Sequence, residues 1–447
     1  MSKNDFSRRR FLGYSALGLT GLTVLPSWTI ANGIRVAPSD RVTMGFIGLA
    51  KQGMNDFKSF SRCPGIQIVA CSDVERLKRE RFKIKVEEWQ KAQKVKQRCD
   101  MYEFYEELLD RKDIDAVSIA TPDHWHALIT IHACQARKDV YVQKPLAFTV
   151  QEGLEMVKAV RLNNRVLQVG SQQRSGKEFQ KAIELVRNGS IGHITTIFAT
   201  VGDPPKPFDL PEFSVPESLN WNLWLGPLND PKIHYHPDLC PPISLNPPKD
   251  EATWGAWRWY RETGNGYTAD WGAHMFDIAQ AAIGMDGLGP SEFIPKGYKD
   301  IPYLTMKYAN GVVMTEQPYN DTAKAPNRGL KFNGTKGWIK VARGYIDCSD
   351  PSLLKEQEEV NDAKQYEVSS PHMQNFIDAV RSRKDPIAPV EVGCSTNTLC
   401  CIANIATELQ RPVKWNPATL SFGDDTEALN HRLNHYQYRN PYLLKNF

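Results

Sequence analysis

The chain has 447 residues and a formal net charge of +4 at pH 7. This length exceeds what one hydrophobic core supports, so two domains are expected. Residues 1–31 hold four basic residues and one acidic residue, which leaves +1 for the rest and gives no electrostatic reason to expect nucleic acid or an anionic membrane as partner. Nine cysteines without paired zinc-type spacing are expected to be small buried residues, and we predict no metal site.

Residues 1–31 have the features of a twin-arginine leader. They contain a basic SRRRFL run at residues 7–12, a short apolar stretch up to Ile30 and small residues suited to cleavage near Ala31. The stretch is shorter than a membrane span, so no stable membrane anchor is expected; an uncleaved anchor and a buried helix remain as alternatives. The sequence predicts export of the folded protein to the periplasm by the twin-arginine machinery.

A dinucleotide fingerprint follows the first apolar strand. Residues 41–47 lead into Gly48, Ala50 and Gly53, which occupy the three fingerprint positions. The first glycine permits the tight turn and the last lets the helix pack on the strand. Ala50 replaces the middle glycine, which normally lets the backbone approach the pyrophosphate, and its methyl group is small enough to keep the motif usable.

An acidic residue follows the next strand. Residues 66–71 form an apolar run that ends before Asp73, twenty residues after Gly53. A carboxylate at this place binds the ribose hydroxyls and disfavours a 2′-phosphate. We therefore expect NAD rather than NADP, although Arg76 and Lys78 could accommodate the phosphate and Asp73 could instead cap the next helix.

Strands alternating with helices continue the first domain. Short apolar runs at 116–120, 140–142 and 166–169 are separated by helical segments, which is typical of a doubly wound parallel sheet. Ligands bind at the carboxyl ends of such strands, so the residues that follow them are expected beside the cofactor. These residues are Thr121, Pro122, His126 and Lys144.

The second half of the chain predicts an antiparallel sheet. Strands are expected at 194–200, 303–309, 312–316 and 337–342, and helices near 371–382 and 392–409. The predicted fold class is α/β, with an N-terminal Rossmann domain and a C-terminal α+β domain built on a large, mostly antiparallel open sheet. The expected limits are 1–31 for the leader, 32–165 and 166–420 for the two domains, and 421–447 for a C-terminal tail.

One predicted helix carries an acid–imidazole pair. The apolar residues of 269–284 recur at helical spacing, and Asp270 and His274 lie one turn apart on the adjacent stripe. A carboxylate can orient a substrate or a ring, while an imidazole exchanges a proton near neutral pH. A surface pair without chemistry is the alternative.

Tryptophans concentrate in the same region. Six of the eleven lie between residues 221 and 271, interleaved with polar groups such as Arg258. Aromatic faces cover the C–H face of a pyranose, so we expect a carbohydrate ligand with Trp224 and Arg258 among its contacts. Twelve prolines between residues 203 and 249 predict a long stiff loop, either a wall over the pocket, a subunit contact or an irregular surface connection.

Four motifs follow one another along the chain: the fingerprint, ATPDHWH at 120–126, VQKP at 142–145 and DWGAHMFD at 270–277. In these motifs and their order the chain resembles the family of glucose-fructose oxidoreductase, inositol dehydrogenase and rhizopine catabolism proteins. The resemblance implies that Lys144 lies between nicotinamide and substrate, and that Asp270 and His274 line the substrate pocket. It also places Gln173, Arg174 and His372 near that pocket. Where the family usually has glutamate before this lysine, the chain has Gln143, which cannot pair with the lysine as a carboxylate would.

The predicted function is that of an exported NAD-dependent oxidoreductase, with NADP less favoured. It would transfer hydride between a sugar, glycoside or polyol hydroxyl and a tightly bound nicotinamide cofactor. The roles expected are proton removal by His274, positioning by Asp270 and charge stabilisation by Lys144, and the primary base is left open between His274 and Lys144. The alternatives are NAD-dependent glycoside processing by transient oxidation and a non-catalytic sugar or nucleotide sensor. The family resemblance further implies a homodimer or homotetramer formed through the second-domain sheet.

Overall fold

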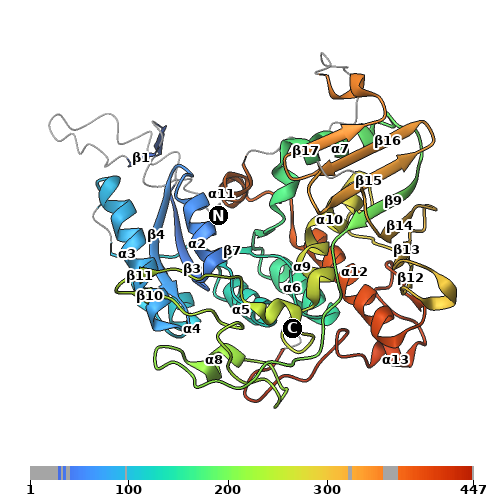
Figure 1. Ribbon diagram of the computed structural model, residues 1–447. Coiled ribbons are helices and arrows are strands. Elements are labelled where there is room, and N and C mark those ends of the chain that lie inside the picture. Colours follow the sequence, from blue (N-terminus) through green and yellow to red (C-terminus); the bar gives the residue numbers. More distant parts are fainter. Residues whose placement is uncertain are drawn as a thin grey trace, which may run out of the picture.

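The computed structural model describes residues 41–95, 98–320, 325–355 and 371–444, together with the backbone of the paired strands β1 (Thr29–Ala31) and β2 (Ile34–Val36). Residues 1–28, which hold most of the predicted leader, lie outside the described residues. Two sheets organise the remainder, one at the left and one at the upper right in Figure 1. No helix among the described residues is long and apolar enough to cross a bilayer.

The first domain is built on a parallel sheet of six strands in the order β5-β4-β3-β6-β7-β8. The strands are β3 (Val42–Ile47), β4 (Ile66–Ser72), β5 (Asp100–Tyr102), β6 (Ala116–Ile119), β7 (Asp139–Val142) and β8 (Leu167–Val169). Strands β6, β7 and β8 are buried along their whole length, and β3 and β4 at all but one residue, because helices cover both faces. The predicted Rossmann architecture is confirmed, and β8 continues this sheet past residue 165.

Helices cover this sheet on two sides. One side packs against α2 (Lys51–Phe60), α3 (Arg76–Ala92) and the distant α11 (His372–Ser382), and the other against α4 (Tyr105–Leu109), α5 (Asp123–Gln135) and α6 (Val150–Leu162). Helix α6 begins with a capping box in which Thr149 and Glu152 bond each other's backbone amides.

The second domain is built on eight strands in the order β17-β16-β15-β9-β14-β13-β12-β18. They are β9 (Ile194–Thr200), β12 (Glu292–Ile294), β13 (Thr305–Lys307), β14 (Val313–Glu316), β15 (Gly329–Gly334), β16 (Gly337–Ala342), β17 (Tyr345–Cys348) and β18 (Val413–Lys414). Every neighbouring pair is antiparallel except β9 and β14, so the mostly antiparallel sheet is confirmed.

Three helices carry most of the core of the second domain. They are α7 (Lys177–Arg187), α10 (Gly272–Ala282) and α12 (Val390–Leu409). The helix predicted at 269–284 is in fact two, because the backbone opens at Trp271 (φ −97°, ψ −25°) between α9 (Gly266–Asp270) and α10. Within the described residues, single turns of 3-10 helix lie at η3 (Gln172–Ser175), η4 (Ala256–Trp259), η5 (Tyr298–Asp300) and η6 (Pro351–Leu354).

Residues 203–259, which we call the strap, lie against the first domain (Figure 1). The helices and strands of the strap are α8 (Trp221–Leu225), the hairpin of β10 (Ser244–Leu245) and β11 (Pro248–Lys249), and η4. Its own apolar cluster includes the stacked rings of Trp221 and Trp224, 4.6 Å apart. The strap is therefore a packed element rather than a loose connection.

The residues predicted as a tail are also packed. Beyond residue 420, Phe422 and Leu433 are buried in the second-domain core, and α13 (Thr426–Leu429) lies between them. The Tyr438 hydroxyl donates to the Glu152 carboxylate at 2.5 Å. This segment is thus bound to both domains.

Candidate active site

The turn between β3 and α2 fits a dinucleotide phosphate. Gly48 has φ +83°, and a Cβ there would lie 2.6 Å from the Ala120 carbonyl carbon; a Cβ on Gly53 would lie 2.1 Å from the Gly48 oxygen. Both positions therefore require glycine. Ala50 has φ −70° and ψ −169°, a conformation open to any residue, so the missing middle glycine does not distort the turn.

Asp73 lies at the end of β4, where its carboxylate supports the same turn. It accepts hydrogen bonds from the backbone N–H groups of Leu49 (2.6 Å) and Glu75 (2.8 Å). The N-cap of α3 is Glu75, so Asp73 does not cap that helix. The carboxylate also lines the adjacent cavity, as ribose recognition requires.

A cavity of about 330 Å³ extends from this turn. Its walls come from the first domain, the strap and the C-terminal segment, and they include Gly48, Ala50, Asp73, Thr121, Pro122, Trp224, Trp254, Arg258, Pro441 and Tyr442. Trp224, predicted as a sugar contact, is buried in the wall of this nucleotide cavity.

A buried ion pair holds the strap over the nucleotide cavity. Arg81 of α3 bonds Asp250 at 2.8 Å and Glu251 at 2.7 Å, and it also donates to the Leu49 carbonyl at 2.7 Å. Only 7% of the Arg81 side chain and 3% of the Glu251 side chain are exposed. The Arg81 side chain therefore connects α3 to both the strap and the fingerprint turn.

Lys144 follows β7 and precedes a cis-proline bond. Its Nζ donates to the Asp270 carboxylate at 2.7 Å and to the Asp270 carbonyl at 3.0 Å. The Arg258 Nε lies 3.6 Å from the same carboxylate. Burial alone would raise the pKa of Asp270, but the Lys144 and Arg258 cations hold that pKa below its ordinary value, so Asp270 is ionised.

His274 lies on α10, one turn beyond Asp270, and both residues line a second cavity. Its Nδ1 is buried and has no hydrogen-bond partner among the described residues. Burial, with the nearby positive charges of Lys144 and Arg343, lowers the pKa of His274 well below its ordinary value. The ring is neutral at pH 7, and a neutral imidazole with a free ring nitrogen can accept a proton.

The substrate cavity has a volume of about 750 Å³ and adjoins the nucleotide cavity. Both are lined by Ala120, Thr121, Trp254, Trp257 and Arg258. A hydroxyl placed near Lys144 and His274 would therefore lie beside the carboxyl ends of β6 and β7, where a doubly wound sheet binds the reactive end of a dinucleotide.

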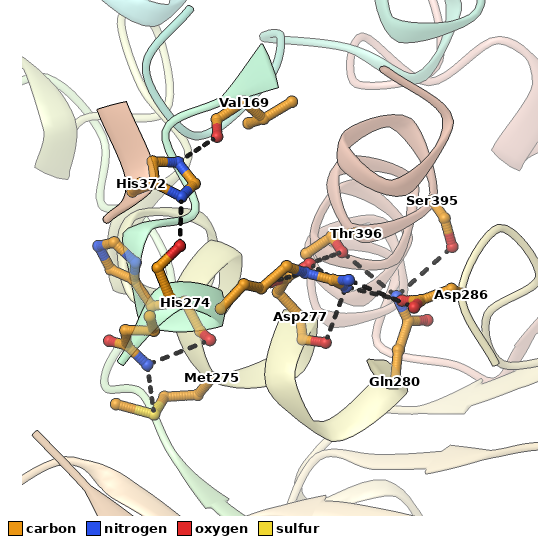
Figure 2. A network of polar contacts seen from close by, with 12 residues as sticks. Val169, His274, Met275, Asp277, Gln280, Asp286, His372, Ser395 and Thr396 are labelled. Carbon is orange, nitrogen blue, oxygen red and sulfur yellow. Dashed lines mark hydrogen bonds and ion pairs between the residues drawn. The ribbon is translucent and has the colours of Figure 1, made fainter. Parts of the chain in front are cut away.

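Gln173 and Arg174, adjacent on η3, have different surroundings. Gln173 lines the substrate cavity and accepts a hydrogen bond from Arg343 Nε at 3.0 Å. Arg174 is buried, bonds Asp277 at 2.7 Å and Asp286 at 2.7 Å (Figure 2), and is not among the cavity-lining residues. The structure thus places Arg174 in an ion-pair network that joins η3 to α10, away from the predicted substrate contact.

Two predicted histidines join segments of the fold. The ring nitrogens of His126 lie 3.0 Å from the Thr121 carbonyl and 2.8 Å from the Pro145 carbonyl. Those of His372 lie 3.0 Å from the Val169 carbonyl and 3.1 Å from the Ser175 hydroxyl (Figure 2). Burial lowers the pKa of each to about 4. Neither lines a cavity described here.

Among the cavity residues that the sequence analysis missed are Asp56, Arg328 and Arg343. Asp56 of α2 accepts from the Gln143 amide at 2.9 Å and from Gln52 at 2.8 Å, and burial raises its pKa to about 7. Arg328 directly precedes β15 and Arg343 directly follows β16, so both lie at the open end of the β15–β16 hairpin and line the cavity. An arginine that directly follows the strand predicted at 337–342 is a signal that could have identified Arg343; β15 was not predicted, so Arg328 had no such signal.

Family models match both halves of the chain. Residues 42–171 match the oxidoreductase family, NAD-binding Rossmann fold, and residues 206–444 match the oxidoreductase family, C-terminal alpha/beta domain. Among curated proteins, an uncharacterised oxidoreductase, YrbE, of Bacillus subtilis is 30% identical over 37% of this chain, and a glycosyl hydrolase family 109 protein of Shewanella pealeana is 29% identical over 42%. The matches span 46% and 44% of those relatives.

Solved structures share the fold. Myo-inositol 2-dehydrogenase from Lactobacillus plantarum is 19% identical with a TM-score of 0.53, and levoglucosan dehydrogenase in complex with NADH and levoglucosan is 16% identical with a TM-score of 0.54. Each alignment covers 84% of this chain and 99% of the other. With both of its domains matched, the chain belongs to the GFO_IDH_MocA family of oxidoreductases, which has an NAD-binding Rossmann domain and a C-terminal alpha/beta domain.

Proposed function

We propose that the chain is an exported NAD-dependent oxidoreductase that oxidises a hydroxyl of a sugar, glycoside or polyol. The observation that carries this proposal is a pair of adjoining cavities: the dinucleotide turn lines the first, and Lys144, Asp270 and His274 line the second. Sugar and inositol dehydrogenases among the proteins of the same fold support this substrate class.

The side chains fit alcohol oxidation. NAD bound in the first cavity would supply the acceptor for the hydride from the carbon. The neutral His274 ring accepts the hydroxyl proton. Lys144, held by Asp270, donates a hydrogen bond to the substrate oxygen and stabilises its developing negative charge. Carbon loses a hydride and oxygen loses a proton, which leaves a carbonyl.

NAD is proposed in preference to NADP. The Asp73 carboxylate lies at the cavity wall, where it repels a 2′-phosphate. Lys78 also lines this cavity, but its Nζ lies 3.4 Å from the Cys240 thiol. Arg76 pairs with Glu80 on the helix surface.

We propose further that the cofactor stays bound through many turnovers. The strap and Tyr442 wall the nucleotide cavity, and the Arg81 ion pair holds the strap in place. The leader motif supports this, because twin-arginine export moves folded proteins and carries a bound cofactor with them. Each hydride would then leave through a second substrate or an external acceptor.

Native purification of the exported protein tests this proposal. Denaturation should release close to one NAD or NADH per chain after extensive dialysis, and addition of a suitable sugar should change the nicotinamide absorbance. A sensor would bind sugar without that change. Release of no nucleotide, with activity strictly dependent on added NAD, would contradict tight binding.

The glycosyl hydrolase family 109 relatives favour a second candidate, in which oxidation is transient and a glycosidic bond is cleaved before the hydride returns. A p-nitrophenyl glycoside separates the two. Release of nitrophenol with no net NADH would support glycoside processing, and accumulation of an oxidised glycoside would support dehydrogenation.

We also propose self-association through the second-domain sheet. The half-buried rings of Phe198 and Trp338, with Lys331 near both, lie on that sheet. Light scattering of wild type and Trp338→Glu measures the assembly. A monomeric wild type would contradict it.

A further inference from the structure

Positive charge dominates the substrate cavity. Its cationic side chains are Lys144, Arg258, Arg328 and Arg343. Among its carboxylates, Asp270 is ionised beside Lys144, whereas burial raises the pKa of Asp123 well above the ordinary value and that of Asp56 to about 7. Two of the four carboxylates that line the cavity, Asp56 and Asp123, are therefore held toward the neutral form, which leaves positive charge in excess.

Arg328 and Arg343 face each other across the mouth of a hairpin. Leu330 pairs with Val341 in the β15–β16 register, and the same register continued by two residues sets Arg328 opposite Arg343. Like charges directly opposite each other on paired strands are destabilising. Sheet stability therefore gives no reason for two arginines at these positions.

Each guanidinium is held through only part of its surface. Arg328 Nε donates to the Val201 carbonyl at 2.9 Å and Arg343 Nε donates to Gln173 Oε1 at 3.0 Å. Both guanidinium carbons lie 4.6 Å from the centre of the Trp271 ring. These contacts fix the two groups and leave their terminal nitrogens for a ligand.

Asp270 attracts both arginines from a distance, but neither has a paired carboxylate among the described residues. Within the part of the chain that the structure describes, no carboxylate lies within ion-pair distance of Arg328 or Arg343. In contrast, Arg174 and Arg81 each bond two carboxylates. Arg328 is half-buried and Arg343 lies exposed at the cavity rim, so an anion entering the cavity would meet both.

We propose that the substrate is an anionic sugar, whose carboxylate, sulfate or phosphate is bound by the terminal nitrogens of Arg328 and Arg343. The inference rests on the proposed function, because it assumes a sugar in this cavity. Guanidinium groups bind planar and tetrahedral oxyanions through paired, charge-assisted hydrogen bonds. Trp271, which contacts both arginines, directly follows Asp270 and precedes His274 by three residues, so one sugar can present its anionic group to the arginines and a hydroxyl to Lys144 and His274.

Equilibrium binding of matched sugars tests the proposal without relying on turnover. The pairs are methyl glucoside with methyl glucuronide, and methyl galactoside with methyl galacturonide; glucose 6-sulfate and glucose 6-phosphate form the tetrahedral arm. Isothermal titration of the holoprotein should show at least one anionic sugar bound about 10- to 100-fold more tightly than its neutral partner, since bonds to charged groups are the strong ones. This preference should weaken with added salt.

Charge-removing variants assign the effect to the two arginines. Arg343→Gln, at the exposed rim, should remove most of the preference, measured as the ratio of the affinities for the anionic and the neutral sugar, and Arg343→Lys should restore part of it. Arg328→Gln should also reduce the preference for anionic sugars, and circular dichroism checks that this variant is folded. Lys331→Gln removes a charge from β15 outside the cavity and should change nothing.

The outcomes separate this inference from the proposed function. If no anionic sugar binds more tightly than its neutral partner, or if the preference survives in both arginine variants, the inference is wrong. If arginine-dependent binding occurs but no tested sugar reduces bound NAD, the inference holds and the proposed oxidation fails. If neutral and anionic sugars are bound and oxidised equally, the oxidation holds and the inference fails.

Discussion

The Lys144 ammonium contacts Asp270 twice, at 2.7 Å from the carboxylate and 3.0 Å from the backbone carbonyl. This pair joins the end of β7 to the junction of α9 and α10, and so joins the two domains at the cavity. The acid that is absent at Gln143 is thus supplied for Lys144 by the second domain. The Gln143 amide instead donates to the Asp56 carboxylate and makes no bond to Lys144 among the described residues.

Lys144→Ala should lower kcat/KM by about 10²- to 10⁴-fold, the usual contribution of a group that acts in proton transfer or on the developing charge. Folding and nucleotide content should change little, because Arg258 still faces Asp270. The matched control is Lys158→Ala, a surface lysine on α6. Retention of wild-type turnover by Lys144→Ala would remove the lysine from the mechanism.

His274→Ala should lose activity to a similar degree while keeping the fold and the cofactor. Because burial and nearby cations lower the pKa of His274 well below its ordinary value, kcat/KM of the wild type should not fall where an ordinary imidazole titrates, but only at lower pH. A pH–rate profile measures this. A fall centred near pH 7 that persists in Asp56→Asn would contradict a neutral His274 in the resting protein.

Asp73→Ala should weaken discrimination against NADP by at least about tenfold, since it removes both the ribose contact and the repulsion of the 2′-phosphate. Asp73→Asn is the sharper variant, because its side-chain oxygen can still accept from the Leu49 N–H that Asp73 now bonds. The ratio of dissociation constants for NAD and NADP is the measurement. Equal affinity of the unmodified protein for both cofactors would contradict the assignment.

Arg81→Met should destabilise the protein by about 3–5 kcal/mol, because it leaves the Glu251 carboxylate buried without its partner. Nucleotide should also be lost faster on dialysis. The double variant Arg81→Met/Glu251→Met should recover much of the unfolding free energy, which urea denaturation measures. Arg76→Met, on the exposed face of α3, is the control, and an equal loss of nucleotide from it would contradict a specific latch.

Asp56 makes stability depend on pH in a defined direction. Burial raises its folded-state pKa to about 7 from 3.8, so the folded protein retains a proton that the unfolded chain has lost. The contribution is present below about pH 4, falls as pH rises to about 7, and amounts to a change on the order of 4 kcal/mol. Asp56→Asn should remove this slope in urea unfolding between pH 4 and 8. An unchanged slope would show that other groups cause it.

The parallel sheet was predictable because its strands are buried on both faces and appear as short apolar runs, as β4 and β6 do. The division into α9 and α10 at Trp271 was not predictable from the sequence. Backbone hydrogen bonds continue across this residue, because the Trp271 N–H donates to the Tyr267 carbonyl and the Met275 N–H donates to the Trp271 carbonyl. A local change of dihedral angles separates α9 from α10, and the spacing of apolar side chains does not reveal such a change.

The candidate site was predictable where a motif is local and only partly where it depends on tertiary packing. Lys144, Asp270 and His274 meet as the motifs imply. Arg174 was assigned to the substrate because it adjoins Gln173, but in a 3-10 turn adjacent side chains point in different directions. Arg328 and Arg343 come together only through strand pairing.

The position of Tyr442 has a consequence for biosynthesis. Its ring helps to wall the nucleotide cavity, yet it is synthesised long after the fingerprint at residues 48–53. A nascent chain whose first domain has already folded therefore still has an open dinucleotide site. Under the proposed tight binding and export, firm cofactor retention would signal that the second domain and the segment beyond it have been made and docked, which is the condition a folded-protein exporter needs to be met before transport.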